Sequence, residues 1–182
     1  MSKGVLIIDL QNAVFDGRQI PPAHDAQRLL ENASALLHAA RQAGVPVIHI
    51  QHCAPAGEAL EEGGPGWPIY APLAPRDGEP VVRKRFVSAF EETDLEATLQ
   101  GLDVRTLIVT GIQSEQCVAA TCRAALTLGY GVYLAQDGHS TWPDNDLSAG
   151  QIVALQNEQL QDAGVELRGT EELVAAIGGS VP

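Results

Sequence analysis

The sequence predicts an α/β protein in which a parallel β-sheet lies between two layers of helices. Three observations lead to this three-layer α/β/α class. Short apolar runs rich in β-branched residues alternate with longer amphipathic segments along the chain. Four of the apolar runs are nearly continuous in apolar character, which is typical of strands covered on both faces. Strands that alternate with helices favour a parallel sheet with right-handed crossovers.

Six segments are short enough, and rich enough in β-branched residues, to be strands. They are 4–10, 45–52, 81–84, 106–112, 131–137 and 165–168. The segment 53–80, between the second and third strands, is crowded with Gly and Pro and has no clear period. We interpret it as an irregular insert, which is either functional, as a lid or an interface arm, or a tolerated surface loop.

The helices expected between the strands carry start and stop signals. The first is built on Leu and Ala at helical spacing between 29 and 40, and it ends at Gly44. The helix after the fourth strand is expected to run to about residue 128. Capping residues are expected at the starts of four helices: Thr93 with Glu96, Ser114, Ser148 with Gln151, and Thr170.

Composition limits the classes of function. The chain has 182 residues, 45% hydrophobic and 19% charged, enough for a single domain, 1–182, with a full core. The net charge is −12 and the only cationic cluster is 83–85, so we expect no nucleic-acid partner and no membrane partner. The apolar run at the N-terminus lacks a cleavage site, and three cysteines without metal-like spacing favour a reducing cytoplasm.

Candidate chemistry lies where the predicted strands end, because parallel sheets bind ligands beyond the carboxyl ends of their strands. Cys117 falls in the first turn of a helix, where the helix dipole is expected to lower a thiol pKa and make a nucleophile. The alternative for Cys117 is a small buried thiol, the commonest fate of a free cysteine.

Three charged residues end other predicted strands. Asp9 closes an apolar run, where it is either a general base for a thiol or a structural turn residue. Lys84 is either a cation that steadies Asp9 and a thiolate or a solvated surface residue. Asp137 ends the fifth strand, and we favour a role in capping the next turn.

Three segments then carry a family resemblance: LIIDLQN, VVRKRFVSAF and GIQSEQCVAATCRAALTLGY. In order and spacing they resemble the signature segments of the isochorismatase-like cysteine hydrolases, a superfamily that includes nicotinamidases and N-carbamoylsarcosine amidases. The resemblance extends over essentially the whole chain. It implies a six-stranded parallel sheet of order 3-2-1-4-5-6 and a catalytic triad of Asp9, Lys84 and Cys117.

The same resemblance implies further features of the site. The peptide bond between Ile112 and Gln113 is expected to be cis, so that the Gln113 N–H joins the Cys117 N–H in an oxyanion hole. In the implied strand order, strand two separates Asp9 from Lys84. Since neighbouring strands are about 4.8 Å apart, Lys84 must lean inward by a route that the sequence does not define.

The implied activity is cysteine-dependent cleavage of an amide, carbamoyl or lactam C–N bond in a small molecule, through a thioester. One alternative is an ether hydrolase of the true isochorismatase type, although those enzymes lack the nucleophilic cysteine. Another is a non-catalytic binding protein on the same fold. The resemblance also implies a homodimer or homotetramer. The identity of the substrate is not predicted.

The sequence departs from the nicotinamidases at their metal site. His49 and His52 face opposite sides of a strand, and Gln51 replaces an acidic ligand, so we expect no metal and no cofactor. Candidate pocket residues include His139 and Trp142, which would line a pocket or a subunit interface. The candidate substrate-binding residues, whose aromatic members are equally suited to a core, are Gln11, Phe15, Trp67, Phe90 and Gln116.

Two other enzyme classes fit poorly. Haloacid-dehalogenase-like phosphatases need a second acid two positions after the first, and here that position is Gln11. A dinucleotide-binding protein needs a G-x-G-x-x-G turn after the first strand, and here the turn reads DLQNAV.

Overall fold

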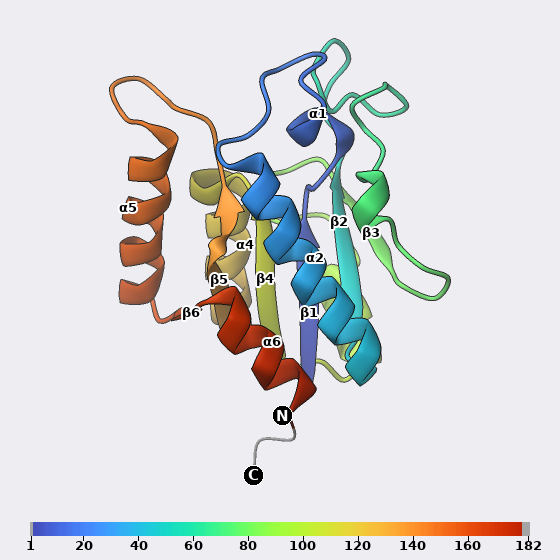
Figure 1. Cartoon of the computed structure of the whole chain (residues 1–182). Helices are drawn as coiled ribbons and strands as arrows, with labels where there is room; N and C mark the ends of the chain where they lie inside the picture. The colour runs from blue at the N-terminus through green and yellow to red at the C-terminus, as the bar shows by residue number, and fades with distance from the viewer. Residues whose placement is uncertain (1, 180–182) are drawn as a thin grey trace.

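A computed structural model describes residues 2–179 of the chain. Within them, six parallel strands form one sheet in the order β3-β2-β1-β4-β5-β6, which confirms the predicted α/β class and strand order. The carboxyl ends of the strands lie at the top of the molecule in Figure 1. The strands are β1 (Lys3–Ile8), β2 (Val47–His52), β3 (Val81–Lys84), β4 (Thr106–Ile112), β5 (Gly131–Ser140) and β6 (Glu166–Arg168).

Helices cover both faces of the sheet, so the architecture has three layers. One face packs against α1, α2 and α6 and the other against α3, α4 and α5. Figure 1 shows α2 and α6 in front of the sheet and α4 behind it. The helices are α1 (Asn12–Phe15), α2 (Ala26–Ala43), α3 (Leu95–Gly101), α4 (Ala119–Thr127), α5 (Ala149–Asp162) and α6 (Thr170–Gly178).

The continuous apolar character of β1 follows from this double cover. Val5 and Ile7 belong to the core beneath α2 and α6, whereas Leu6 and Ile8 belong to the core beneath α3 and α4. All four side chains are almost completely buried. Each contributes about 1.5–3 kcal/mol by leaving water, so β1 is a firm support for the residue that follows it.

Two of the predicted helix signals are confirmed. Gly44 ends α2 in the left-handed conformation, with φ of 67°. Ser148 and Gln151 form a reciprocal capping box at the start of α5. The carboxyl end of α2 and the start of α5 were therefore readable from local sequence, because both signals act within a few residues.

Other capping predictions were wrong. Thr93 makes no capping box, because α3 begins two residues later and the Thr93 hydroxyl donates to the carbonyl of Ala89. Thr170 is the first residue of α6 rather than its cap. Its N–H and hydroxyl both donate to Oδ1 of Asp137, at 2.9 and 2.7 Å. Asp137 thus caps a helix 33 residues away instead of the next turn.

The insert 53–80 is irregular but tied to the sheet edge. It contains one 3₁₀ turn, η1 (Ala71–Leu73), and isolated bridges that join Ala54 to Glu61 and Gln11 to Ile69. Leu73 is fully buried. In Figure 1 the loops beside α1 rise above the carboxyl ends of the strands, so part of the insert covers the edge of the sheet where chemistry was expected.

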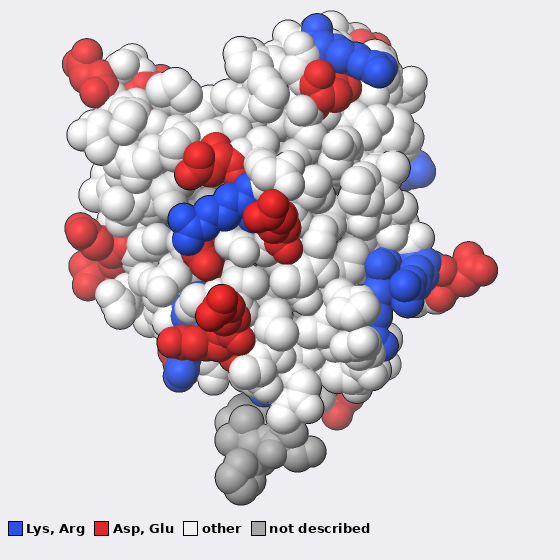
Figure 2. All heavy atoms as spheres, in the orientation of Figure 1, with Lys and Arg blue, Asp and Glu red and all other residues white. Residues whose placement is uncertain are grey.

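The surface carries scattered charges. On the face shown in Figure 2, Lys and Arg side chains lie next to Asp and Glu side chains, and wide uncharged areas separate these groups. Within residues 2–179, no helix is both long and apolar enough to span a bilayer.

Candidate active site

The three predicted catalytic residues meet at the carboxyl end of the sheet. Asp9 directly follows β1, where the chain turns with φ of 54°. Lys84 is the last residue of β3. Cys117 lies in η2 (Ser114–Val118), a π-helical turn between β4 and α4. Since β1 and β4 are neighbours at the point where the strand order reverses, this is the place at which open α/β sheets bind ligands.

Lys84 connects the other two residues. Its Nζ lies 2.9 Å from Oδ2 of Asp9 and 3.1 Å from Sγ of Cys117. The ammonium is also 3.1 Å from the carbonyl oxygen of Phe86 and 3.2 Å from Nδ1 of His52. The Lys84 side chain is 0% exposed, so these contacts replace water around the charge.

The strand register explains how Lys84 reaches Asp9 across β2. Lys84 pairs with His52, whereas the last residue of β1, Ile8, pairs with Ile50. Lys84 therefore begins two residues beyond the end of β1, and its side chain extends past the end of β2 beside His52. The contact to His52 Nδ1 marks this route.

The electrostatics of the site differ from the sequence prediction. Burial and the Asp9 charge raise the pKa of the Cys117 thiol and Lys84 opposes both, which leaves the pKa at about 12. Burial also disfavours the Lys84 ammonium, but the charges of Asp9 and Cys117 outweigh burial and raise the pKa of Lys84. The expected lowering of the thiol pKa by a helix dipole was wrong, because desolvation by burial dominates the pKa of Cys117.

Asp9 has the properties of a proton acceptor in this setting. Its carboxylate is 2% exposed. Oδ2 is held by Lys84, whereas Oδ1 has no hydrogen-bond donor within the described part of the chain. A buried carboxylate oxygen without a donor is costly, and a proton from the neighbouring thiol satisfies it.

The turn that carries Gln113 is anchored from behind. The peptide bond between Ile112 and Gln113 is cis, and Gln113 and Cys117 both line the cavity at this end of the sheet. The Ser114 hydroxyl, which was predicted to cap the helix, instead lies 2.8 Å from Nδ1 of His139. Sequence reasoning missed this contact because it joins η2 to β5 across 25 residues.

His139 is fixed in turn by α5. Its Nε2 lies 2.9 Å from Oδ1 of Asn157, whose amide nitrogen donates to the carbonyl of Gln136. The Asn157 oxygen accepts, so Nε2 carries the proton and Nδ1 accepts from the Ser114 hydroxyl. Burial lowers the pKa of His139, which favours this neutral imidazole. The chain Asn157–His139–Ser114 thus holds the turn next to Gln113.

Asp9 and Cys117 line a cavity of about 280 Å³. Its polar lining groups include Asp9, Gln113 and Cys117 at the strand ends. Its apolar walls come from α1, the segment after α1, the insert, the end of β4 and the segment after β5. The apolar residues are Ala13, Val14, Ile20, Ala54, Ala59, Leu60, Ile112 and Trp142. The insert 53–80 therefore contributes to the cavity of its own chain.

The three aromatic candidates for substrate contact lie outside this lining. Phe15 stacks on Tyr70 with ring centroids 4.4 Å apart. The ring of Trp67 lies beneath the guanidinium of Arg83, at 4.8 Å. Phe90 packs against the core under α3 and α4. Each ring has a neighbour that removes it from water elsewhere, and sequence could not show this because the helix α1 and the folding of the insert were not foreseen.

The two glutamines also lie outside the cavity. Gln11 is fully buried, donates to the carbonyls of His52 and Trp67, and accepts from the His52 N–H. It therefore fastens the insert to β2. Gln116 is exposed on the outer side of η2. Trp142, by contrast, does line the cavity and donates its indole N–H to the carbonyl of Pro21 at 2.7 Å.

The two strand histidines have separate partners. Nε2 of His49 lies 3.1 Å from the carboxylate of Glu79, which also binds Arg41. His52 contacts Lys84. In the part of the chain that is described, no three His, Cys, Asp or Glu side chains gather as metal ligands would.

Comparison with known proteins agrees with this fold. Residues 3–172 match the model of the isochorismatase domain, so the chain belongs to the isochorismatase family. An isochorismatase from Pseudomonas putida KT2440 has a similar structure, with a TM-score of 0.88, 30% identity, and coverage of 93% of this chain and 89% of that one.

Two relatives have been named for their reactions. The chain is 39% identical over 140 residues to a streptothricin hydrolase of Streptomyces noursei, which covers 77% of this chain and 50% of the relative. It is 29% identical over 176 residues to a ureidoacrylate amidohydrolase of Stutzerimonas stutzeri, covering 77% and 71%. The chain thus spans about half the length of the streptothricin hydrolase that it matches.

Proposed function

We propose that this protein is a cysteine-dependent hydrolase that cleaves an amide, carbamoyl or lactam C–N bond of a small molecule. The observation that carries the proposal is the contact of the Lys84 ammonium with both Asp9 and the Cys117 sulfur at the base of a cavity. The names of the streptothricin hydrolase and the ureidoacrylate amidohydrolase support hydrolysis. An ether hydrolase would have no use for a thiol in this position.

The first half of the reaction forms a thioester. Asp9 accepts the thiol proton of Cys117 as the sulfur attacks the carbonyl carbon, and Lys84 stabilises the charge that develops on the sulfur. The N–H groups of Gln113 and Cys117 donate to the oxyanion. Asp9 then passes its proton to the nitrogen, the C–N bond breaks and the amine or ammonia leaves.

The second half restores the enzyme. Asp9 accepts a proton from water, and the hydroxide attacks the thioester carbonyl. The C–S bond breaks, the carboxylic or carbamic acid leaves, and the proton returns to the Cys117 sulfur. The high pKa of the thiol is compatible with this scheme, because the sulfur is ionised only during the attack and is a good proton acceptor at the end.

A substrate panel tests the proposal. Release of ammonia or amine is measured for small amides, carbamoyl compounds and lactams with the wild type and with Cys117→Ala. We expect turnover of at least one compound by the wild type and none by Cys117→Ala. Cys122→Ala, which removes a buried core thiol away from the site, is the matched control and should retain activity. Full activity of Cys117→Ala would overturn the proposal.

We also propose that the protein works in the cytoplasm as a homodimer or homotetramer. The three cysteines are unpaired, in keeping with a reducing compartment. Light scattering coupled to size-exclusion chromatography tests the assembly, and a strictly monomeric mass at high concentration would contradict it.

A further inference from the structure

The cavity carries one negative charge that nothing in the site balances. Of its lining residues, Asp9 and Glu58 are acidic. Lys84 neutralises Asp9 through a contact of 2.9 Å. Within residues 2–179, the Glu58 carboxylate has no ion-pair partner and accepts no hydrogen bond, although it lines the same cavity. Its side chain is exposed, which puts it at the opening rather than the base.

His52, which also lines the cavity, does not supply a balancing cation. Burial and the neighbouring Lys84 ammonium lower the pKa of His52, so the imidazole is neutral near pH 7. The charge of Glu58 acts on the same ring in the opposite direction, so the carboxylate at the opening lies within electrostatic range of His52. No Lys or Arg lines the cavity in the described residues.

Hydrogen bonds fix the backbone of the turn that carries Glu58. The Glu58 N–H donates to the carbonyl of Pro55 at 3.2 Å, and its own carbonyl accepts from the Glu61 N–H at 3.0 Å. The other acids nearby have structural partners. Glu61 accepts from the N–H of Gly57, and Glu62 pairs with Arg85. Glu58 is therefore the acid of this turn that is left for a ligand.

We propose that the cavity selects substrates with a cationic group, an ammonium or a guanidinium, several bonds from the scissile carbonyl, and that Glu58 is the residue that determines this preference. The inference rests on the proposed hydrolase function of the same site. A cation bound in the cavity would be attracted to the Glu58 carboxylate, because no Lys or Arg of the described lining balances that charge. A carboxylate substrate, such as the ureidoacrylate that one relative is named for, would bring a second negative charge into this cavity.

Charged thiol reagents test the preference without any knowledge of the substrate. The (2-aminoethyl) and (2-sulfonatoethyl) methanethiosulfonates differ in the sign of their charge and both modify cysteine. Their rates at Cys117 are measured by mass spectrometry of the peptides, and each rate is divided by that of the same reagent with free 2-mercaptoethanol. We expect Glu58→Gln to lower the ratio of cationic to anionic rates by about threefold to tenfold. Glu58→Lys should lower it further.

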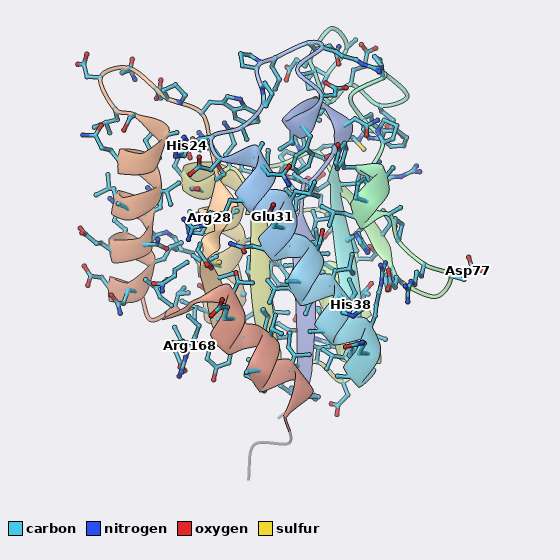
Figure 3. All side chains as sticks on the ribbon, in the orientation of Figure 1. His24, Arg28, Glu31, His38, Asp77 and Arg168 are labelled. Atoms are coloured by element: carbon cyan, nitrogen blue, oxygen red, sulfur yellow. The ribbon has the colours of Figure 1, made fainter. Side chains whose placement is uncertain are left out.

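Asp77→Asn is the matched control, because it removes the same charge at the tip of the loop before β3. Figure 3 labels Asp77 at this tip, remote from the loops beside α1. Asp77→Asn should leave the ratio of rates unchanged. An equal ratio in the wild type and Glu58→Gln would overturn the preference for cations, and so would an equal fall in Asp77→Asn.

Matched amides then connect the preference to catalysis. 4-Aminobutanamide, pentanamide and glutaramate share a chain and differ in the charge at its far end. We expect Glu58→Gln to raise KM for the cationic amide by about threefold to tenfold and to leave the neutral amide unchanged. If no amide is hydrolysed, the hydrolase proposal fails while the reagent rates still decide the role of Glu58. If hydrolysis proceeds without charge preference, only the inference about Glu58 is overturned.

Discussion

The protonation state of Cys117 depends on two neighbours of opposite charge. Lys84 touches the sulfur at 3.1 Å and favours the thiolate, whereas burial and Asp9 favour the thiol. Burial and Asp9 prevail, which gives a nucleophile that is protected as a thiol until a substrate carbonyl is in place. Asp9 thus helps to raise the pKa of the Cys117 thiol and is also the residue proposed to accept its proton.

Removal of the Asp9 charge should separate these two effects. In Asp9→Asn the thiol loses the negative charge that raises its pKa and keeps the Lys84 ammonium that lowers it, so its pKa should fall. Alkylation of Cys117 by iodoacetamide at pH 7 should become several-fold faster. Hydrolysis should fall by about a hundredfold or more, because the general base is lost.

The pH profile of alkylation measures this shift. The wild-type rate should still be rising at the most alkaline pH that the fold tolerates, since the pKa of the thiol is about 12. The Asp9→Asn profile should level off at lower pH. A profile for Asp9→Asn that is identical to the wild type, or displaced to higher pH, would contradict the role given to Asp9.

Between elements, the turn after β4 depends on a buried polar chain that begins at Ser114. Ser114→Ala leaves Nδ1 of His139 without its donor in a buried environment. The free energy of unfolding should fall by about 1–3 kcal/mol, as measured by urea denaturation. The rate of hydrolysis should fall as well, because the Gln113 N–H is then held less firmly.

Thr127→Ala provides the comparison for this variant. Its hydroxyl donates to the carbonyl of Arg123 on the exposed side of α4. Loss of this surface contact should change the free energy of unfolding by less than about 0.5 kcal/mol. If Ser114→Ala and Thr127→Ala lost equal stability, the claim that the buried hydrogen bonds from Ser114 stabilise the turn after β4 would be contradicted.

A second link between elements joins α2, β2 and the end of the insert. The Arg41 guanidinium donates two hydrogen bonds to Glu79 and holds the pKa of that carboxyl at about 2, below its ordinary 4.5. Because the pKa is lower in the folded state, the contribution to stability is complete above pH 4.5 and is lost as the pH falls towards 2.

Glu79→Gln isolates this contribution. Between about pH 4.5 and 2 the wild type should lose on the order of 1–2 kcal/mol more stability than Glu79→Gln. Urea denaturation of both proteins across this range measures the difference. Parallel losses of stability in the two proteins would show that the pKa of Glu79 does not differ between the folded and unfolded states.

At the scale of the whole molecule, the charged side chains on the outer face of α2 are separate from the residues of the site. In Figure 3, Glu31 and His38 project from the outer face of α2, whereas the Arg28 guanidinium lies beside it, 3.8 Å from Asp137 of β5. The catalytic residues instead lie at the carboxyl ends of β1, β3 and β4. This division explains why the surface charges of α2 do not enter the chemistry.

The fold was predictable because its signals are local and repeated. Because the strands are buried on both faces, their sequences are apolar runs. Gly44 marks the end of α2 and Ser148 marks the start of α5, each through interactions within a few residues. The strand order came from the family resemblance rather than from periodicity. Asp9, Lys84 and Cys117 were candidates because the carboxyl ends of parallel strands lie at the same edge of a sheet, where ligands bind.

The rest depends on contacts that sequence does not encode locally. The reach of Lys84 follows from the register of β3 on β2, and the raised pKa of Cys117 follows from tertiary burial. The contact between Ser114 and His139 requires β5 to continue to Ser140, three residues beyond its predicted end. Among the aromatic candidates, Trp67 was misplaced because side-chain direction in the irregular insert has no period.

The central claim is that the Cys117 sulfur becomes acylated during turnover. The most direct test is acid quenching of the protein during its reaction with p-nitrophenyl acetate, followed by mass spectrometry of its peptides. We predict one acetyl group on the Cys117 peptide of the wild type, its disappearance when the reagent is exhausted, and its absence from Cys117→Ala. Turnover of the ester with no acetyl group on Cys117, or with the acetyl group on another residue, would contradict the account.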